Sequence, residues 1–239
     1  MARQQNPIDG IIFDKDGTLL DFEATWGVWA SAFLTEISGG DATLAHRLGQ
    51  AIGFDIPNAQ FLPASIAIAG TQAQVAGALV AHLPGISQDH MIERMNSSAA
   101  VAPMAEVVPL RPLIERLSAR GLHLGVATND AQDPARAHLQ AVGILEFFPF
   151  IAGFDTGYGY KPDPGQLVAF AKEFDLAPGR VAMVGDSLHD LHAGRAAGMI
   201  TIGVLSGPAT ARELTPQADV ILTDIGELPA WIDEQSAKQ

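Results

Sequence analysis

Two carboxylates stand one residue apart near the start of the chain. Asp14 and Asp16 follow the apolar residues 11–13, and Gly17 and Thr18 come directly after them. A short apolar run bounded by a turn signal is typical of a buried parallel strand, so both aspartates are expected at its carboxyl end, where open α/β sheets bind ligands. Close carboxylates repel each other unless one is protonated or a cation lies between them, which favours a hard ion such as Mg²⁺. An Asx turn with solvated charges is the alternative for the pair taken alone.

Polar side chains also follow later apolar segments that are typical of strands. Any one of them could be a turn former, a helix cap or a solvated loop charge. Their joint placement at one edge of one sheet favours a shared site instead. The residues are Thr128, Asn129 and Asp130 after segment 122–127, Lys161 in the loop 159–164, and Asp186, Ser187 and Asp190 after segment 181–184.

The elements that must position these groups alternate regularly from residue 109 onward. Such alternation requires right-handed crossovers and predicts an α/β fold with a doubly wound, Rossmann-like parallel sheet. Two helices are expected to open with an aspartate cap and a first-turn proline, at Asp133-Pro134 and at Asp163-Pro164. The expected strands are residues 8–13, 122–127, 150–154, 181–184, 200–205 and 220–222.

A different pattern fills the chain between the first strand and residue 105. Trp26, Trp29, Ala30 and Phe33 have helical spacing, further helical stretches cover about 42–52 and 72–82, and no strand-like alternation stands out. The predicted organisation is a core domain of residues 1–20 and 106–239, with an inserted helical cap domain of residues 21–105.

Composition bounds the possible partners and location. The 239 residues include 14 Lys and Arg against 27 Asp and Glu, a formal net charge of −13, with 48% apolar residues and no cysteine. This acidic balance argues against nucleic acid or an anionic membrane as a partner. The absence of cysteine excludes disulfides and thiolate metal sites. Because no signal peptide or membrane-spanning run stands out, a cytoplasmic location is expected. The oligomeric state is not indicated.

The ordered set of motifs resembles the haloacid dehalogenase superfamily of phosphohydrolases, and within it the phosphoglycolate-phosphatase-like members. The resemblance covers nearly the whole chain and implies a hydrolase core with a helical cap between the first and second motifs. The matching motifs are Asp14-x-Asp16-Gly17-Thr18, Thr128 after an apolar strand, Lys161 before Pro162, and Gly185-Asp186-x-x-x-Asp190.

The resemblance implies hydrolysis of a small phosphorylated substrate through an aspartyl-phosphate. Asp14 would be the nucleophile, and Asp16 would protonate the leaving alcohol and then deprotonate water. Thr128 and the amide of Asn129 would hydrogen-bond the phosphoryl oxygens, Lys161 would balance their charge, and Ser187 would orient Asp186 or a metal-bound water. The Mg²⁺ ligands would be Asp14, the backbone carbonyl of Asp16 and Asp186, with Asp190 as a direct or indirect support.

Several discriminations follow from the same resemblance. Asp16 favours phosphate chemistry over carbon–halogen cleavage, and the absence of lysine from the insert excludes a phosphonatase-type Schiff base. A sugar phosphomutase and a receiver-like, non-hydrolytic phosphate sensor remain the alternatives, and the role of Lys15 stays open. The substrate implied is a compound such as 2-phosphoglycolate. Candidates for binding its anionic group are Arg47, Arg94, His46, His82 and His90, although a solvated helix face or a satisfied buried histidine is the favoured explanation for each.

Overall fold

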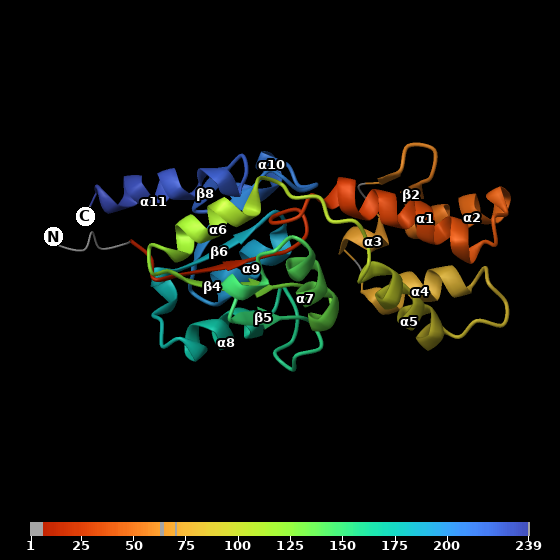
Figure 1. Ribbon diagram of the computed structural model, residues 1–239, viewed down its shortest axis with the longest axis horizontal. Helices are drawn as coiled ribbons and strands as arrows, with labels where there is room; N and C mark the ends of the chain where they lie inside the picture. Colours follow the sequence, from red (N-terminus) through yellow and green to blue (C-terminus); the bar gives the residue numbers. More distant parts are fainter. Residues whose placement is uncertain (1–6, 63–64, 70, 239) are drawn as a thin grey trace. The chain divides into compact units, whose positions relative to one another are not determined.

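The chain folds into two compact units in the computed structural model, which describes residues 7–62, 65–69 and 71–238. The first unit comprises Met1–Asp21 and Ala105–Gln239, and the second comprises Phe22–Met104. Figure 1 shows a sheet flanked by helices in the first unit and a group of helices in the second. The predicted α/β fold with a parallel sheet and a helical insert is confirmed.

A six-stranded parallel sheet forms the centre of the first unit, with the strand order β5-β4-β1-β6-β7-β8. Its central strand is entirely buried, as expected for an apolar segment covered on both faces. The strands are β1 (Gly10–Phe13), β4 (His123–Ala127), β5 (Phe150–Ala152), β6 (Val181–Gly185), β7 (Ile200–Val204) and β8 (Val220–Leu222).

The strand order reverses direction at β1, and a binding site can form beside such a reversal. Ile12 pairs with Gly125 of β4 on one side and with Met183 of β6 on the other. The chain proceeds outward from β1 through β4 and β5, and then returns to the opposite side of β1 as β6. Doubly wound sheets bind ligands at the carboxyl ends of the strands beside such a reversal.

Helices cover both faces of this sheet. Phe170 of α8 and Ala193 of α9 pack with Ile12, Ala127 and Met183 in one buried cluster. Figure 1 shows α6 and α11 on the other side of the sheet from α8, and an ion pair of 2.8 Å joins Arg120, after α6, to Asp233 on α11. The helices are α6 (Leu110–Ser118), α7 (Gln132–Ala141), α8 (Gly165–Glu173), α9 (Leu188–Ala196), α10 (Ala211–Leu214) and α11 (Leu228–Ser236), with short 3₁₀ turns η2 (Leu145–Phe147), η3 (Pro178–Arg180) and η4 (Ile225–Glu227).

The two expected aspartate caps are wrong in detail. The residue that caps α7 is Ala131, so Asp133 lies within the first turn of the helix. Pro164 precedes α8 as its cap residue, and Asp163 instead accepts a hydrogen bond of 2.9 Å from the amide of Gly165. In both cases the aspartate still places negative charge beside the amino end of a helix, where the helix dipole favours it.

The second unit has its own apolar core, formed by helices and one small hairpin. The expectation of a strand-free insert is wrong, because Phe54–Asp55 and Gln60–Phe61 pair as the two-residue antiparallel strands β2 and β3. Phe54 and Phe61 face each other with ring centroids 4.7 Å apart and are buried in this core. Its helices are α1 (Val28–Ile37), preceded by the π-helical turn η1 (Glu23–Gly27), and α2 (Ala42–Ile52), α3 (Ile66–Ala69), α4 (Gln72–Val80) and α5 (Gln88–Ala99).

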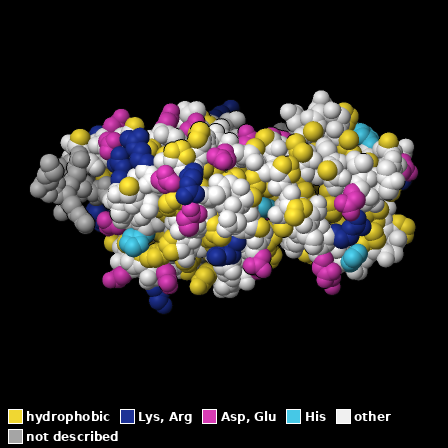
Figure 2. Space-filling view, in the orientation of Figure 1, with side chains coloured by type: hydrophobic (Ala, Val, Ile, Leu, Met, Phe, Trp, Pro, Cys, Tyr) yellow, Lys and Arg dark blue, Asp and Glu magenta, His cyan; other side chains and the backbone are white. Residues whose placement is uncertain are grey.

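Charged side chains of both signs are mixed on one face of the molecule. On the face drawn in Figure 2, the basic side chains of the described residues lie singly or in small groups among acidic ones. Within the described parts of the chain, no helix is both long and apolar enough to cross a membrane.

The two chain segments that lead to and from the insert pair with each other. The Asp21 amide donates to the Ala105 carbonyl at 2.8 Å, Leu20 forms an antiparallel bridge with Glu106, and the Val107 amide donates to the Leu19 carbonyl at 3.1 Å. The ends of the insert are therefore already adjacent within the first unit.

Replacing residues 22–104 by a short Gly/Ser linker should leave a folded sheet domain, because the linker need only span adjacent, hydrogen-bonded ends and loop closure costs little there. Circular dichroism and urea unfolding should show a cooperative transition. An uncooperative, molten product would contradict the division of the chain into these two units.

Candidate active site

Asp14 is placed at the centre of the sheet edge by the strand that precedes it. Its amide donates to the Val184 carbonyl at 2.8 Å, so the parallel ladder between β1 and β6 extends one residue beyond β1. Gly17 then turns the chain with a φ of 80°, a backbone conformation that favours glycine, and its amide donates to the Leu20 carbonyl at 2.7 Å. The predicted turn after the two aspartates is confirmed.

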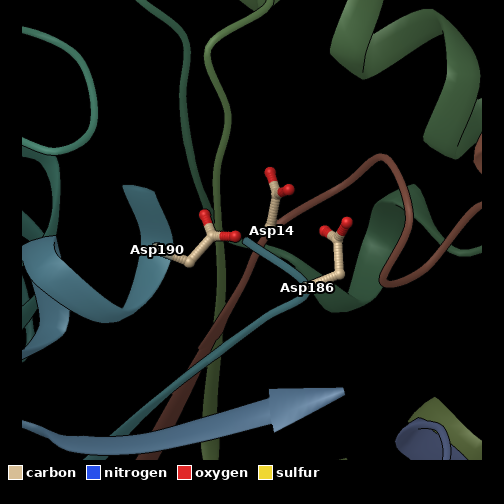
Figure 3. Close-up of side chains that lie close together, drawn as sticks. All are labelled: Asp14, Asp186 and Asp190. Carbon is tan, nitrogen blue, oxygen red and sulfur yellow. The ribbon is translucent and has the colours of Figure 1, made fainter. Parts of the chain in front are cut away.

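Three carboxylates converge at this edge. Oxygens of Asp14, Asp186 and Asp190 lie within 4.8 Å of one another, and all three residues are largely or fully buried. Figure 3 shows that they come from different elements: Asp14 follows β1, Asp186 follows β6, and Asp190 projects from α9. Segments far apart in the sequence thus supply one compact acidic group.

One lysine joins two of these carboxylates. Lys161 Nζ donates to Asp14 Oδ1 and to Asp190 Oδ1, each at 2.6 Å, and its side chain is 3% exposed. A buried ammonium between two carboxylates has strongly charge-assisted hydrogen bonds. Sequence analysis predicted Lys161 to balance phosphate charge, and the structure places it against the residue predicted to be the nucleophile.

The crowding of negative charge alters the proton affinities. Burial, together with the nearby carboxylates of Asp190 and Asp16, raises the pKa of Asp14 to about 7, although Lys161 opposes the shift. Burial and the carboxylates of Asp14 and Asp190 likewise raise the pKa of Asp186 well above its usual range. For Lys161, burial acts to lower the pKa, but Asp14 and Asp190 outweigh it and raise it. One lysine therefore does not neutralise the three acidic groups.

A divalent cation would balance the excess negative charge of these three carboxylates. The donors are carboxylate oxygens, which hard ions such as Mg²⁺ prefer, and the three side chains carry more negative charge than Lys161 compensates. Asp14, Asp186 and Asp190 are the residues that could hold the ion, although Asp190 also pairs with Lys161. The carboxylate of Asp16 is not part of this acidic group.

Asp186 is enclosed by backbone that approaches it closely. A Cβ at Gly17 or at Gly207 would overlap its carboxylate, and Thr18 Oγ1 donates to Asp186 Oδ1 at 3.3 Å. Ser206 Oγ donates to the Gly17 carbonyl at 2.7 Å, which ties the loop after β7 to the turn after β1. None of the predicted site residues lies in this loop. A Ser-Gly pair directly after a predicted strand was the available signal.

Asp190 is oriented by the start of its own helix. Ser187 is the N-cap of α9, and its amide and hydroxyl donate to Asp190 Oδ2 at 3.0 and 2.6 Å. Ser187 was expected to orient Asp186 or a metal-bound water, and its hydroxyl instead closes a capping box with Asp190. A contact of Ser187 with a metal-bound water stays a prediction. One oxygen of Asp190 therefore belongs to the helix cap and the other contacts Lys161, while its role as a metal support stays a prediction.

Thr128 and Asn129 follow β4 as predicted. Thr128 is 2% exposed, and its hydroxyl accepts a hydrogen bond of 3.1 Å from the Asp130 amide. The Asn129 side chain clamps the backbone of Lys161: its Oδ1 accepts from the Lys161 amide at 2.8 Å, and its Nδ2 donates to the Lys161 carbonyl at 2.9 Å. The sequence indicated the Asn129 amide as a phosphate ligand but gave no sign that its side chain positions the lysine.

Asp16 and Lys15 form a second charged group at the same turn. Both oxygens of the Asp16 carboxylate lie within hydrogen-bond distance of Lys15 Nζ, and Lys15 is fully buried. Burial acts to lower the pKa of Lys15, but the carboxylates of Asp16 and Asp130 raise it, so the side chain stays charged.

The candidates for substrate recognition lie in the insert. Arg47 is exposed on α2, and Arg94 on α5 pairs with Glu36 at 2.7 Å. His46, His82 and His90 are also exposed. The role of Arg47 in substrate binding stays a prediction.

The profile of the haloacid dehalogenase-like hydrolases matches residues 8–198, which span all four motifs. The chain belongs to this family. It is 28% identical over 222 residues to a phosphoglycolate phosphatase of Thiobacillus denitrificans, covering 92% of this chain and 94% of that one. It is also 34% identical over 113 residues to a phosphoglycolate phosphatase of Escherichia coli K12, covering 47% and 45% of the two chains. The predicted membership of the haloacid dehalogenase superfamily is confirmed, as is the resemblance to relatives named phosphoglycolate phosphatase.

Solved structures share the fold at lower sequence identity. A haloacid dehalogenase-like hydrolase from Bacteroides fragilis superposes with a TM-score of 0.69 at 20% identity, covering 92% of this chain and 99% of that one. A β-phosphoglucomutase from Clostridium difficile superposes with a TM-score of 0.67 at 16% identity, with coverage of 97% and 98%. At these identities the likeness shows that the chain shares its fold with these two proteins.

Mg²⁺ should raise the melting temperature of the purified protein near neutral pH. A ligand that binds only the folded state at about 100 times its Kd contributes about 2.7 kcal/mol. Asp186→Asn should lose most of this shift in thermal melts with and without Mg²⁺, because it removes one of the converging carboxylates. Asp175→Asn is the matched control, since Asp175 is exposed. An undiminished shift in the Asp186 variant would contradict the proposed ion site.

Removing Asp14 should change how stability depends on pH in the metal-free protein. Its pKa of about 7 exceeds the ordinary 3.8, so the folded protein retains a proton that the unfolded chain releases. This contribution to stability is complete below about pH 4 and is lost as the pH rises through about 7. The free energy of unfolding of Asp14→Asn should therefore increase relative to wild type across this range, measured by urea titration in EDTA. A pH-independent difference would argue against a protonated Asp14.

Proposed function

We propose that the protein is a Mg²⁺-dependent phosphomonoester hydrolase in which Asp14 becomes transiently phosphorylated. The observation that carries this proposal is the position of the Asp14 carboxylate, which lies 2.6 Å from Lys161 Nζ and within 4.8 Å of carboxylate oxygens of Asp186 and Asp190. A nucleophile, a fixed cation and a set of hard-ion ligands are the parts that phosphoryl transfer requires.

The chain supplies the reacting groups. Asp14 attacks phosphorus and the bond to the alcohol oxygen breaks, while Asp16 donates a proton to that oxygen. Asp16 then takes a proton from water, which attacks the aspartyl-phosphate and releases inorganic phosphate with Asp14 restored. Lys161 and the Thr128 hydroxyl stabilise the negative charge on the phosphoryl oxygens. Mg²⁺, held by Asp14, Asp186 and the Asp16 carbonyl with Asp190 in support, would neutralise the phosphate and lower the repulsion between it and the nucleophile.

The substrate proposed is a small alkyl phosphomonoester, and 2-phosphoglycolate is the first compound to test. Two related chains are named phosphoglycolate phosphatase, which supports this substrate. The insert also has no lysine that could form the Schiff base of a phosphonatase. Arg47 is the proposed contact for the substrate carboxylate. The wild-type enzyme should be assayed against a panel of phosphomonoesters for phosphate release, with sugar phosphates also examined for isomerised product, which would indicate a mutase.

Asp14→Asn should lower the rate of phosphate release by about 10³-fold or more, because the amide is not a competent nucleophile. The wild-type protein, quenched in acid during turnover, should gain the mass of one phosphoryl group on the peptide that contains Asp14, and the variant should not. Asp175→Asn should retain full activity. Appreciable turnover by the folded Asp14 variant would remove the nucleophile assignment.

A further inference from the structure

Lys15 is buried among side chains of the first unit that come from the turn after β1, the loop after β4 and helix α7. Its Nζ lies 2.7 Å from Asp16 Oδ1 and 2.6 Å from Asp16 Oδ2, and 3.5 Å from Asp130 Oδ2 in the loop after β4. His138 Nδ1 of α7 lies 3.2 Å away, where it accepts a hydrogen bond in the tautomer that carries its proton on Nε2. Lys15 has no exposed surface, and His138 is 1% exposed.

Such a cation is costly to bury for stability alone. A charged lysine is rarely fully buried, and ion pairs inside proteins are often replaceable by apolar side chains without loss of stability. Lys15 immediately follows the proposed nucleophile, and it contacts both oxygens of the residue proposed to transfer protons. Its ammonium also lies 3.5 Å from Asp130 Oδ2 and 3.2 Å from His138 Nδ1.

Resting on the proposed function of Asp16, we propose that Lys15 is a positioning residue that fixes the Asp16 carboxyl group for proton transfer, with His138 and Asp130 holding Lys15. The contact of one ammonium with both carboxylate oxygens matches the ionised form of Asp16, which exists after the proton has gone to the leaving oxygen. Lys15 stabilises that carboxylate and restricts its rotation until water returns a proton to it. Lys15 keeps its own protons throughout.

This role makes a prediction that a purely structural ion pair does not. Departure of an alkoxide requires a proton, whereas 4-nitrophenolate leaves without one. A misplaced Asp16 should therefore slow the cleavage of alkyl phosphates and affect aryl phosphates far less. The kcat/KM value reports the steps through departure of the alcohol, so it excludes the later hydrolysis of the aspartyl-phosphate, which is common to both substrates.

The experiment compares 2-phosphoglycolate with 4-nitrophenyl phosphate for wild type, Lys15→Met, Lys15→Arg and Asp16→Asn, with saturating Mg²⁺. Lys15→Met should lower kcat/KM for 2-phosphoglycolate by about 10- to 100-fold more than for 4-nitrophenyl phosphate, since general acid catalysis contributes about 10²- to 10⁴-fold and misplacement loses part of it. Asp16→Asn should show the same selectivity to a greater extent. Lys172→Met is the matched control, because Lys172 is exposed on α8.

Equal losses on the two substrates, or no loss on either, would overturn the positioning role. If Lys15→Met does not fold, Lys15→Arg decides the question. It retains the buried charge but alters its reach, and a selective loss on 2-phosphoglycolate supports the proposal, whereas parallel values refute it.

Failure of the proposed hydrolase function would give different results from failure of the role proposed for Lys15. Wild-type protein that releases phosphate from neither substrate, or an Asp16→Asn variant with no leaving-group selectivity, would contradict the hydrolase mechanism. A selective Asp16→Asn variant beside a non-selective Lys15→Met variant would refute only the role of Lys15.

Discussion

Three largely buried carboxylates converge beside one lysine that pairs with only two of them, and the rest of the first unit keeps them together despite their repulsion. Asp14, Asp186 and Asp190 would separate if their segments were free to move, since like charges in a low-dielectric environment repel strongly. The ladder that joins β1 to β6 fixes the first two, and the capping box at the start of α9 fixes the third. The folded sheet thus holds negative charge in a concentrated form that favours cations and, through them, phosphate.

The positioning contacts are largely made by backbone and small side chains. Asn129 clamps the peptide groups of Lys161, and the loop after β7 approaches Asp186 so closely that Gly207 has no room for a Cβ. Contacts of this kind restrict the charged side chains without adding further charges. They explain why the acidic group is compact although Asp14 follows β1, Asp186 follows β6 and Asp190 lies on α9.

The fold class and the converging residues could be predicted because strand-forming segments and the residues after them are local features. A parallel sheet brings the ends of its strands to one edge, so Asp14, Thr128 and Asp186 share that edge whatever the details of packing. The contacts of Asn129 and His138 depend on the final approach of separate segments, and no local pattern encodes that approach. The contact between Ser187 and Asp190 is instead local, because it is a capping box within the first turn of α9. The short β2–β3 hairpin was missed because two-residue strands are too brief to show an alternating pattern.

The paired entry and exit of the insert has a consequence for how such proteins diversify. Leu20 and Glu106 form a β-bridge, and hydrogen bonds from the amides of Asp21 and Val107 flank it. The two ends of the insert are therefore hydrogen-bonded to each other within the first unit. Any segment whose own termini lie close together could be grafted at this point without disturbing β1 or β4. Inserted segments could therefore differ between related chains while the arrangement of side chains at the sheet edge stayed the same.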